Sequence, residues 1–153
     1  MALTPEIVHS ACVALLEEKI AGLQLQLDEL KTGLSADSKS TSGDKHETSR
    51  AMAHIEQEHL AGQMAVLRTQ LFTVHKLRSA TPGSSIAAGS LVTTNHGIFY
   101  LCVALGRVTA DGNDVMVLSA QSPLGQVFLG KRTGDTFIFG GRSYVIEGVS
   151  PTG

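Results

Sequence analysis

The sequence predicts an α+β protein in which an antiparallel hairpin of two long helices precedes a smaller β-rich domain with one short helix. Three observations lead to this prediction. Apolar residues recur at alternating steps of four and three along two segments, which is the spacing of helices that pack side by side. A run of small polar residues separates the two segments. Beyond Pro82 the helical spacing gives way to glycines and short alternating apolar runs.

The first helix is expected over about residues 5–35. Thr4 can cap its start, Pro5 suits the first helical position, and Glu6 favours the positive end of the helix dipole. At a rise of 1.5 Å per residue, such a helix would be about 45 Å long. Its apolar seam consists of Leu16, Ile20, Leu23, Leu27, Leu30 and Leu34.

A loop is expected over residues 35–44, followed by a second helix from Asp44 or Lys45 to about Arg78. Asp44 can cap this helix, and Glu47 stands three residues later, as in a capping box. The short loop favours an antiparallel hairpin within one chain, and hence a monomer, over its structural alternative, a parallel dimer. The second apolar seam consists of Leu60, Met64, Leu67, Leu71 and Val74.

The domain boundary is expected at residues 80–81, so that residues 1–80 form the hairpin, with its tip at about 35–47, and residues 81–153 form the β-rich domain. A short helix is expected over Ser122–Gly130, because Ser122 can cap it, Pro123 suits its first position, and Gly130 can end it. The expected strands are Ile86–Val92, Gly97–Leu105, Asp114–Leu118, Thr136–Phe139 and Arg142–Val149.

Composition narrows the class of function. The chain has 12 basic and 14 acidic residues, which argues against a broad basic face that binds bare nucleic acid. Cys12 and Cys102 lie in apolar runs, and neither has another Cys or a His at the spacing of metal ligands. Buried free thiols are therefore expected. The apolar stretches are too short for a membrane-spanning helix. We therefore expect a soluble cytoplasmic protein that makes no use of a membrane.

Two motifs in this sequence resemble those of a known family. The run Ser122-Pro-Leu-Gly-Gln-Val-Phe-Leu-Gly-Lys-Arg-Thr-Gly-Asp135 resembles the Ser-Pro…Gly-Lys…Gly-Asp run in the C-terminal domain of bacterial Gre-type transcript-cleavage factors. Gly43-Asp44-x-x-Glu47 is similar to the tip of their helical hairpin. The motifs occur in the right order, and the two domains that carry them cover nearly the whole chain. The resemblance implies an FKBP-like fold for the C-terminal domain.

The resemblance also implies a function. The C-terminal domain would dock at the mouth of the secondary channel of RNA polymerase, and the hairpin would reach the active site through that channel. Asp44 and Glu47 would help to hold a second Mg²⁺ and a water, so that the polymerase itself cleaves backtracked nascent RNA. The protein would thus stimulate an enzyme without being one. The implied docking residues are Ser122, Pro123, Leu124, Lys131, Arg132 and Asp135.

The spacing of the tip carboxylates is compatible with this chemistry. Residues three apart, such as Asp44 and Glu47, lie on one face of a helix. Mg²⁺ usually takes one or two protein carboxylates and keeps several waters. A purely structural interpretation stands beside this one, because the same two residues form a helix cap and its capping-box partner.

The tip also departs from the family pattern. Where the family has Asn-Ala-Glu-Tyr after Glu47, this chain has Thr48-Ser49-Arg50-Ala51, so that a base replaces the third acid. Lys45 and Arg50 would compete with a metal cation for the carboxylates. A regulator that enters the channel without promoting cleavage is therefore an alternative. A prolyl isomerase of FKBP type is a weaker alternative, because most aromatic residues of the β-rich domain are expected in its core.

Overall fold

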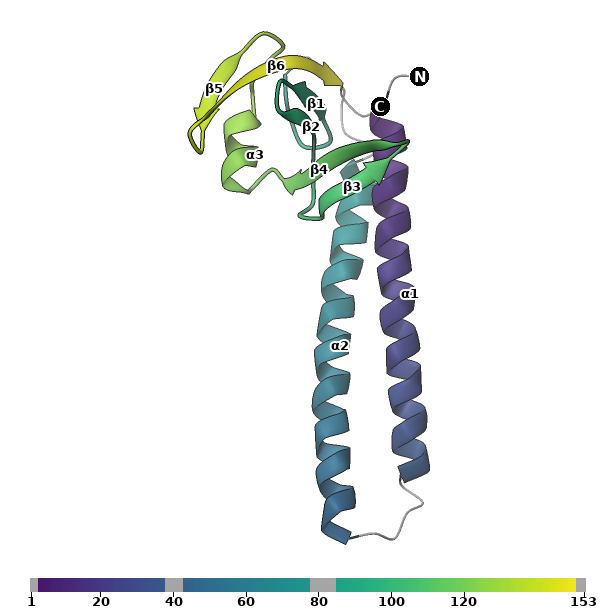
Figure 1. Ribbon diagram of the computed structural model, residues 1–153. Coiled ribbons are helices and arrows are strands. Elements are labelled where there is room, and N and C mark those ends of the chain that lie inside the picture. The colour runs from purple at the N-terminus through teal and green to yellow at the C-terminus, as the bar shows by residue number, and fades with distance from the viewer. Residues whose placement is uncertain (1–2, 38–42, 78–84, 151–153) are drawn as a thin grey trace. The chain divides into compact units, whose positions relative to one another are not determined.

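The computed structural model describes residues 3–37, 43–77 and 85–150. Two N-terminal helices, α1 and α2, precede a six-stranded mixed sheet with one short helix, α3 (Figure 1). This arrangement confirms the predicted α+β class. The predicted domain boundary at residues 80–81 lies outside the described residues. No helix in the described ranges is both long and apolar enough to cross a membrane.

The long helices are α1, Pro5–Asp37, and α2, Gly43–Leu77. The start of α1 is the predicted one: the Thr4 hydroxyl accepts a hydrogen bond of 3.3 Å from the Ile7 backbone N–H. Both helices extend within two residues of their predicted bounds. Of the predicted loop at 35–44, residues 35–37 instead end α1 and residues 43–44 begin α2, and residues 38–42 lie outside the described residues.

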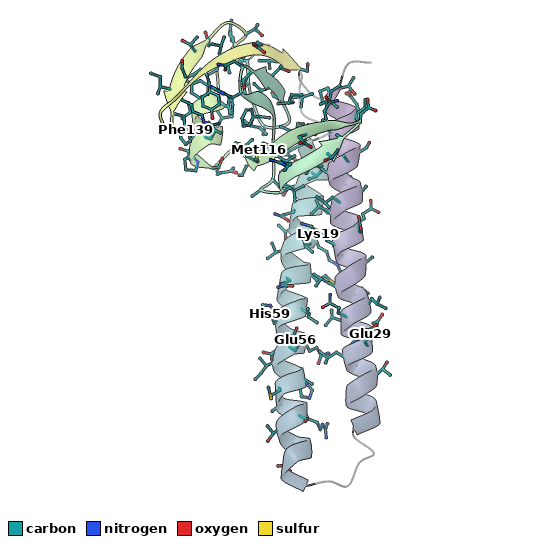
Figure 2. All side chains as sticks on the ribbon, in the orientation of Figure 1. Lys19, Glu29, Glu56, His59, Met116 and Phe139 are labelled. Atoms are coloured by element: carbon teal, nitrogen blue, oxygen red, sulfur yellow. The ribbon has the colours of Figure 1, made fainter. Side chains whose placement is uncertain are left out.

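The chain divides into two compact units, of which one is Leu15–Gln70 and the other joins Met1–Ala14 to Leu71–Gly153. In the first unit, Leu27 of α1 packs against Leu60 and Met64 of α2 in a buried cluster. Three further seam residues flank this cluster, namely Ile20, Leu23 and Leu30. Charged residues such as Glu29 and Glu56 are exposed on the helices (Figure 2). The predicted seam thus holds the two helices together by burial of apolar surface.

The strands are β1 Leu91–Thr94, β2 Gly97–Cys102, β3 Gly106–Ala110, β4 Asn113–Ser119, β5 Thr136–Phe139 and β6 Arg142–Ser150. Their order in the sheet is β3-β4-β2-β1-β6-β5. The β2–β4 pair is parallel, and all other neighbours are antiparallel. The first half of β6 pairs with β5, and its second half pairs with β1. β6 therefore joins the β5–β6 hairpin to the rest of the sheet.

Two strand predictions were wrong. The segment predicted to be extended from Ile86 enters a strand only at Leu91, because Gly89 turns the chain with φ +93° and the Ser90 hydroxyl accepts a bond from the Ala87 N–H. The strand predicted to reach Leu105 ends at Cys102.

A further correction concerns a strand that was not predicted, β3. β3 alternates exposed polar residues with buried Val108 and Ala110, a pattern with too little apolar content to stand out in the sequence. It forms an antiparallel hairpin with β4. At the connecting turn, Asp111 and Gly112 have φ of +50° and +78°, as a two-residue hairpin turn of type I′ requires at its two central residues.

The core of the β-rich domain is aromatic. The ring of Phe128, from α3 at Pro123–Phe128, is fully buried and lies 5.1 Å from the ring of Phe99 and 5.3 Å from that of Phe137. Phe137 in turn stacks on Tyr144 at 4.9 Å with an angle of 7° between the ring planes. These contacts fix α3 against the sheet and so determine where the Ser-Pro motif lies.

Candidate functional site

The Ser-Pro motif forms the start of α3. Ser122 has extended backbone angles, and its hydroxyl accepts a hydrogen bond of 3.0 Å from the Gly125 N–H. The same hydroxyl donates to the Ser119 carbonyl at 2.7 Å. Pro123 takes the first turn and is exposed. The predicted capping role of Ser122 is confirmed, and this cap presents Pro123 on the surface.

In this chain, the backbone around Gly125 leaves no room for a side chain two positions after Pro123. A Cβ atom placed on Gly125 would overlap the backbone oxygen of Ser119, and it would also lie 2.9 Å from the Ser122 hydroxyl. The backbone of α3 therefore passes directly against the end of β4. The helix closes with a hydrogen bond of 3.1 Å from the Leu129 N–H to the Gly125 carbonyl.

The second half of the motif, from Lys131 to Asp135, forms a turn. The Asp135 carboxylate accepts a hydrogen bond of 2.8 Å from the Arg132 backbone N–H, and the Asp135 N–H donates to the Arg132 carbonyl at 3.0 Å. The Lys131 ammonium lies 5.9 Å from the centre of the Phe137 ring. Arg132 and Asp135 are exposed, whereas Lys131 is half-buried. Asp135 therefore stabilises the turn that displays Arg132.

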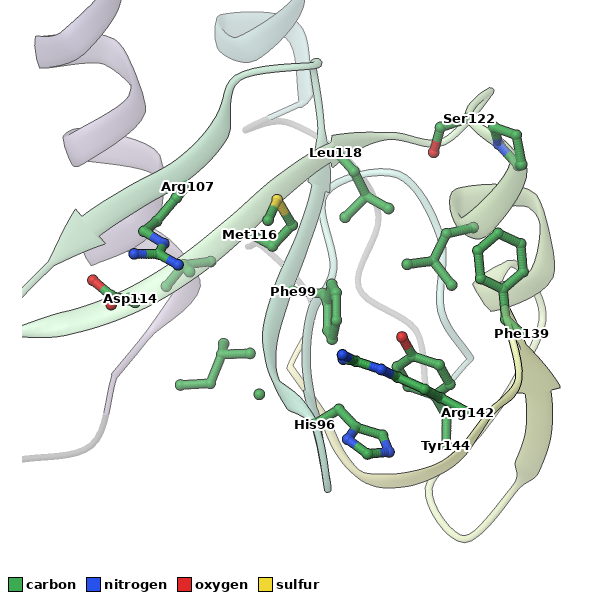
Figure 3. A pocket seen from close by; sticks show the side chains of 15 residues that line it. His96, Phe99, Arg107, Asp114, Met116, Leu118, Ser122, Phe139, Arg142 and Tyr144 are labelled. Atoms are coloured by element: carbon green, nitrogen blue, oxygen red, sulfur yellow. The ribbon is translucent and has the colours of Figure 1, made fainter.

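A groove of about 720 Å³ lies beside the start of α3 (Figure 3). Ser122, Pro123 and Leu124 line one side of it. Lys131, Arg132 and Asp135 are not among its lining residues. The six predicted docking residues thus divide into three at the groove and three on the neighbouring turn. The groove's other side chains come from β2, β3, β4 and the β5–β6 hairpin, and they include Phe99, Arg107, Asp114, Met116, Phe139 and Arg142.

Charged and polar residues surround the groove. The Asp114 carboxylate accepts a hydrogen bond of 3.2 Å from the Thr109 hydroxyl. The His96 ring contacts the Tyr144 ring at 5.0 Å, and its Nε2 atom lies 3.0 Å from the Ser143 carbonyl oxygen. Sequence reasoning missed these residues, because they come together only through the pairing of strands distant in the chain.

The predicted tip residues lie at the start of α2. Asp44 belongs to this helix, but its side chain is outside the described part of the chain. Glu47 and Arg50 follow on the helix, and both are exposed. The oxygen ligand that Glu47 offers suits Mg²⁺, which takes few protein carboxylates. Among the described residues, no group of three or more His, Cys, Asp or Glu side chains is placed to hold a metal ion.

Both cysteines are buried free thiols, as predicted. Burial raises the pKa of the Cys12 thiol to about 11. It also raises the pKa of the Cys102 thiol, to about 12, with a smaller contribution from the nearby Cys12. Burial likewise raises the pKa of the Tyr100 hydroxyl. A raised thiol pKa means little thiolate near neutral pH, so these cysteines are suited to packing and not to nucleophilic chemistry.

The two motifs that carry the family resemblance therefore occupy distinct places: one begins α2, and the other forms α3 and the turn that follows it. The geometry gives the first an exposed carboxylate at Glu47 and gives the second an open groove. Neither the comparison with protein-family models nor that with curated protein sequences finds a match to this chain.

Proposed function

We propose that this protein is a Gre-like transcription elongation factor, which binds RNA polymerase through its secondary channel and stimulates cleavage of backtracked RNA. The observation that carries the proposal is the place of the Gly43-Asp44-x-x-Glu47 motif at the start of the second long helix. There the chain connects α1 to α2, so the motif stands at the end of the hairpin. With 33 and 35 residues, the helices are each about 50 Å long, enough for a deep channel.

The second support for the proposal is the β-rich domain. A mixed sheet with one short helix on an aromatic core is compatible with the FKBP-like fold that the resemblance implies. On this domain, the exposed Pro123 and Arg132 offer contacts to the rim of the polymerase channel. Docking there would leave the hairpin as the part that enters.

In this proposal the polymerase supplies the nuclease centre, and the tip supplies carboxylates. Glu47 is exposed, and so it is accessible to a metal shared with the polymerase. When bound, a second Mg²⁺ stabilises the attacking water and the leaving oxygen of a phosphodiester. Asp44 and Glu47 would hold and orient that water and metal. Nascent RNA would be reached only indirectly, at its 3′ end.

A second candidate function is a regulator that enters the same channel without stimulating cleavage. It is favoured by Arg50, which is exposed on α2 three residues after Glu47 and therefore on a neighbouring part of the helix surface. A guanidinium at this distance can pair with the carboxylate and oppose the binding of a cation. An Arg50→Glu variant should then stimulate more RNA cleavage by the polymerase than wild type does.

A prolyl isomerase is a weaker candidate, and the groove is the place where it would act. Phe99 and Tyr144 line the groove, but both are buried in the aromatic core. Phe139 is the more accessible aromatic side chain. Turnover of a proline-containing test peptide above the uncatalysed rate would support this activity over the other two.

RNA cleavage in a stalled, backtracked elongation complex tests the main proposal. Wild type should shorten the transcript, and the Asp44→Ala/Glu47→Ala double variant should not. A matched control is Glu56→Ala/Glu58→Ala, which removes two exposed acids from the middle of α2 and should leave cleavage unchanged. Binding to core polymerase without cleavage by wild type would favour the non-cleaving regulator. A wild-type protein that fails to bind core polymerase would refute both.

A further inference from the structure

We infer that the groove beside α3 binds a polypeptide segment that carries an apolar side chain between acidic ones. The inference rests on the proposed function only for the identity of the larger protein to which the segment belongs. It goes beyond the docking residues of the motif, because it assigns a role to Arg107, Arg142, Met116 and Phe139. These four residues lie on β3, β6, β4 and β5.

The floor of the groove is apolar and partly open. Phe99, Leu118 and Tyr144 are buried beneath it, whereas the Met116 side chain is 42% exposed. Phe139 is half-buried at the opposite side. Methionine adapts its shape to different apolar partners, which suits it to a binding surface. An apolar side chain inserted between Met116 and Phe139 would therefore remove exposed apolar surface from water.

Each of these apolar residues has an arginine directly opposite it on the neighbouring strand. Arg107 of β3 pairs with Met116 of β4, and Arg142 of β6 pairs with Phe139 of β5. Side chains opposite each other in an antiparallel pair lie on the same face of the sheet. In Figure 3, Arg107 lies on one side of Met116 and Arg142 on the other, near Tyr144. The groove thus has a cation at each side of its apolar floor.

The charges of the groove do not cancel. Its ionised residues are Arg107, Arg142 and Asp114. Within the described ranges, Asp114 accepts a hydrogen bond from Thr109, and neither guanidinium is hydrogen-bonded or in an ion pair. Guanidinium groups bind carboxylates through two parallel hydrogen bonds. The complement of this surface is an acidic group on each side of an apolar one.

A polypeptide segment fits the groove better than a small molecule does. Sites for small molecules enclose most of the surface of their ligand. Here Met116, Pro123 and Arg142 are exposed, so that a ligand would keep one side in contact with solvent. A segment that belongs to a larger protein has that side covered by its own chain.

Two synthetic peptides of equal length test the inference on the full chain. One alternates Leu with Glu, and the other alternates Leu with Lys. Titration of isotope-labelled protein, followed by nuclear magnetic resonance, should show shifts of Met116 and Phe139 with the acidic peptide at millimolar concentration and weaker ones with the basic peptide. No shifts with either peptide, or equal shifts with both, would overturn the inference.

Substitutions that remove a positive or a negative charge from the groove should change the affinity for the acidic peptide in opposite directions, which makes the test specific. Arg142→Gln and Arg107→Gln should each weaken binding of the acidic peptide about threefold, which is the size of one exposed ion pair. Asp114→Asn should strengthen it, whereas Asp111→Asn, at the β3–β4 turn outside the groove, should not. Unchanged affinity in Arg107→Gln, Arg142→Gln and Asp114→Asn alike would contradict the assignment.

Core RNA polymerase separates this inference from the proposed function. If the protein prefers the acidic peptide but does not bind polymerase, the groove inference is supported and the proposed function is refuted. If the protein binds polymerase, Arg107→Gln and Arg142→Gln leave that binding unchanged, and neither peptide is preferred, the proposed function stands and the groove inference is overturned. Retained tyrosine fluorescence in each variant shows that it is folded, because both tyrosines, Tyr100 and Tyr144, lie in the sheet.

Discussion

Gly125→Ala should destabilise the β-rich domain more than a single added methyl group would suggest. The new Cβ atom would overlap the Ser119 carbonyl oxygen, and it would lie only 2.9 Å from the Ser122 hydroxyl oxygen. The first of these atoms belongs to the backbone of β4, so no side-chain rotation relieves the overlap. Either α3 or the end of β4 must move.

The size of the effect follows from two terms. Overpacking at a buried site costs about 1–3 kcal/mol. Movement of α3 also weakens the 3.0 Å bond from the Gly125 N–H to the Ser122 hydroxyl, and loss of a helix cap costs about 1 kcal/mol. Together they predict a loss of about 2–4 kcal/mol in the free energy of unfolding. For a domain of this size, each kcal/mol lowers the melting temperature by about 4–8 °C.

Denaturant unfolding followed by tyrosine fluorescence measures this loss, because Tyr100 and Tyr144 both report on the sheet. Gly148→Ala is the matched control, since a Cβ atom there would meet no atom within 4 Å. The control should stay within about 0.5 kcal/mol of wild type, because its added methyl group meets no other atom. Equal midpoints for Gly125→Ala and Gly148→Ala would refute the steric reasoning.

Three further predictions concern the thiols, the hairpin and the cap. Because burial raises the pKa of Cys12 to about 11 and of Cys102 to about 12 from a usual 9.0, the unfolded chain loses these protons first as the pH rises. Their contribution to stability is therefore complete below pH 9 and lost toward pH 12, and replacement of both by alanine should flatten that loss in a series of unfolding curves. Leu60 is only 5% exposed, so Leu60→Ala should lower the free energy of unfolding of the hairpin by about 2–5 kcal/mol, measured by far-ultraviolet circular dichroism. Leu25 is 60% exposed, so Leu25→Ala should lower it much less. Ser122→Ala should cost about 1 kcal/mol in tyrosine-detected unfolding, and a variant as stable as wild type would show that the cap is dispensable.

The elements that the sequence predicts well are those whose signals are local. Apolar residues at steps of three and four predict α1 and α2, because such a stripe must be buried against a second helix. Ser122, Pro123 and Gly130 predict α3 for a different reason, since each favours one backbone conformation at a helix end. The packing of Leu27 against Leu60 and Met64 agrees with the seams.

The parts that could not be predicted depend on distant contacts. β3 is stabilised by pairing with β4, and an edge strand with only Val108 and Ala110 buried carries a weak pattern. The groove is harder to predict than β3, because Arg107 and Arg142 are 35 positions apart (142 minus 107) in the chain. Only the strand order of the sheet brings both of them to one groove. Each arginine by itself is indistinguishable from a solvated surface residue.

The tip shows why a fold of this kind leaves its own activity open. Glutamate and arginine are both good helix formers, so α2 forms equally well with either residue at position 50. The charge that Arg50 brings beside Glu47 is therefore free to change without a cost to the hairpin. A third acid there would favour a bound cation, whereas a guanidinium opposes one. If the proposed function holds, stimulation of cleavage and entry into the channel without cleavage would differ in exposed tip side chains such as residue 50. The choice would then lie in the chemistry of the site and not in the architecture that carries it.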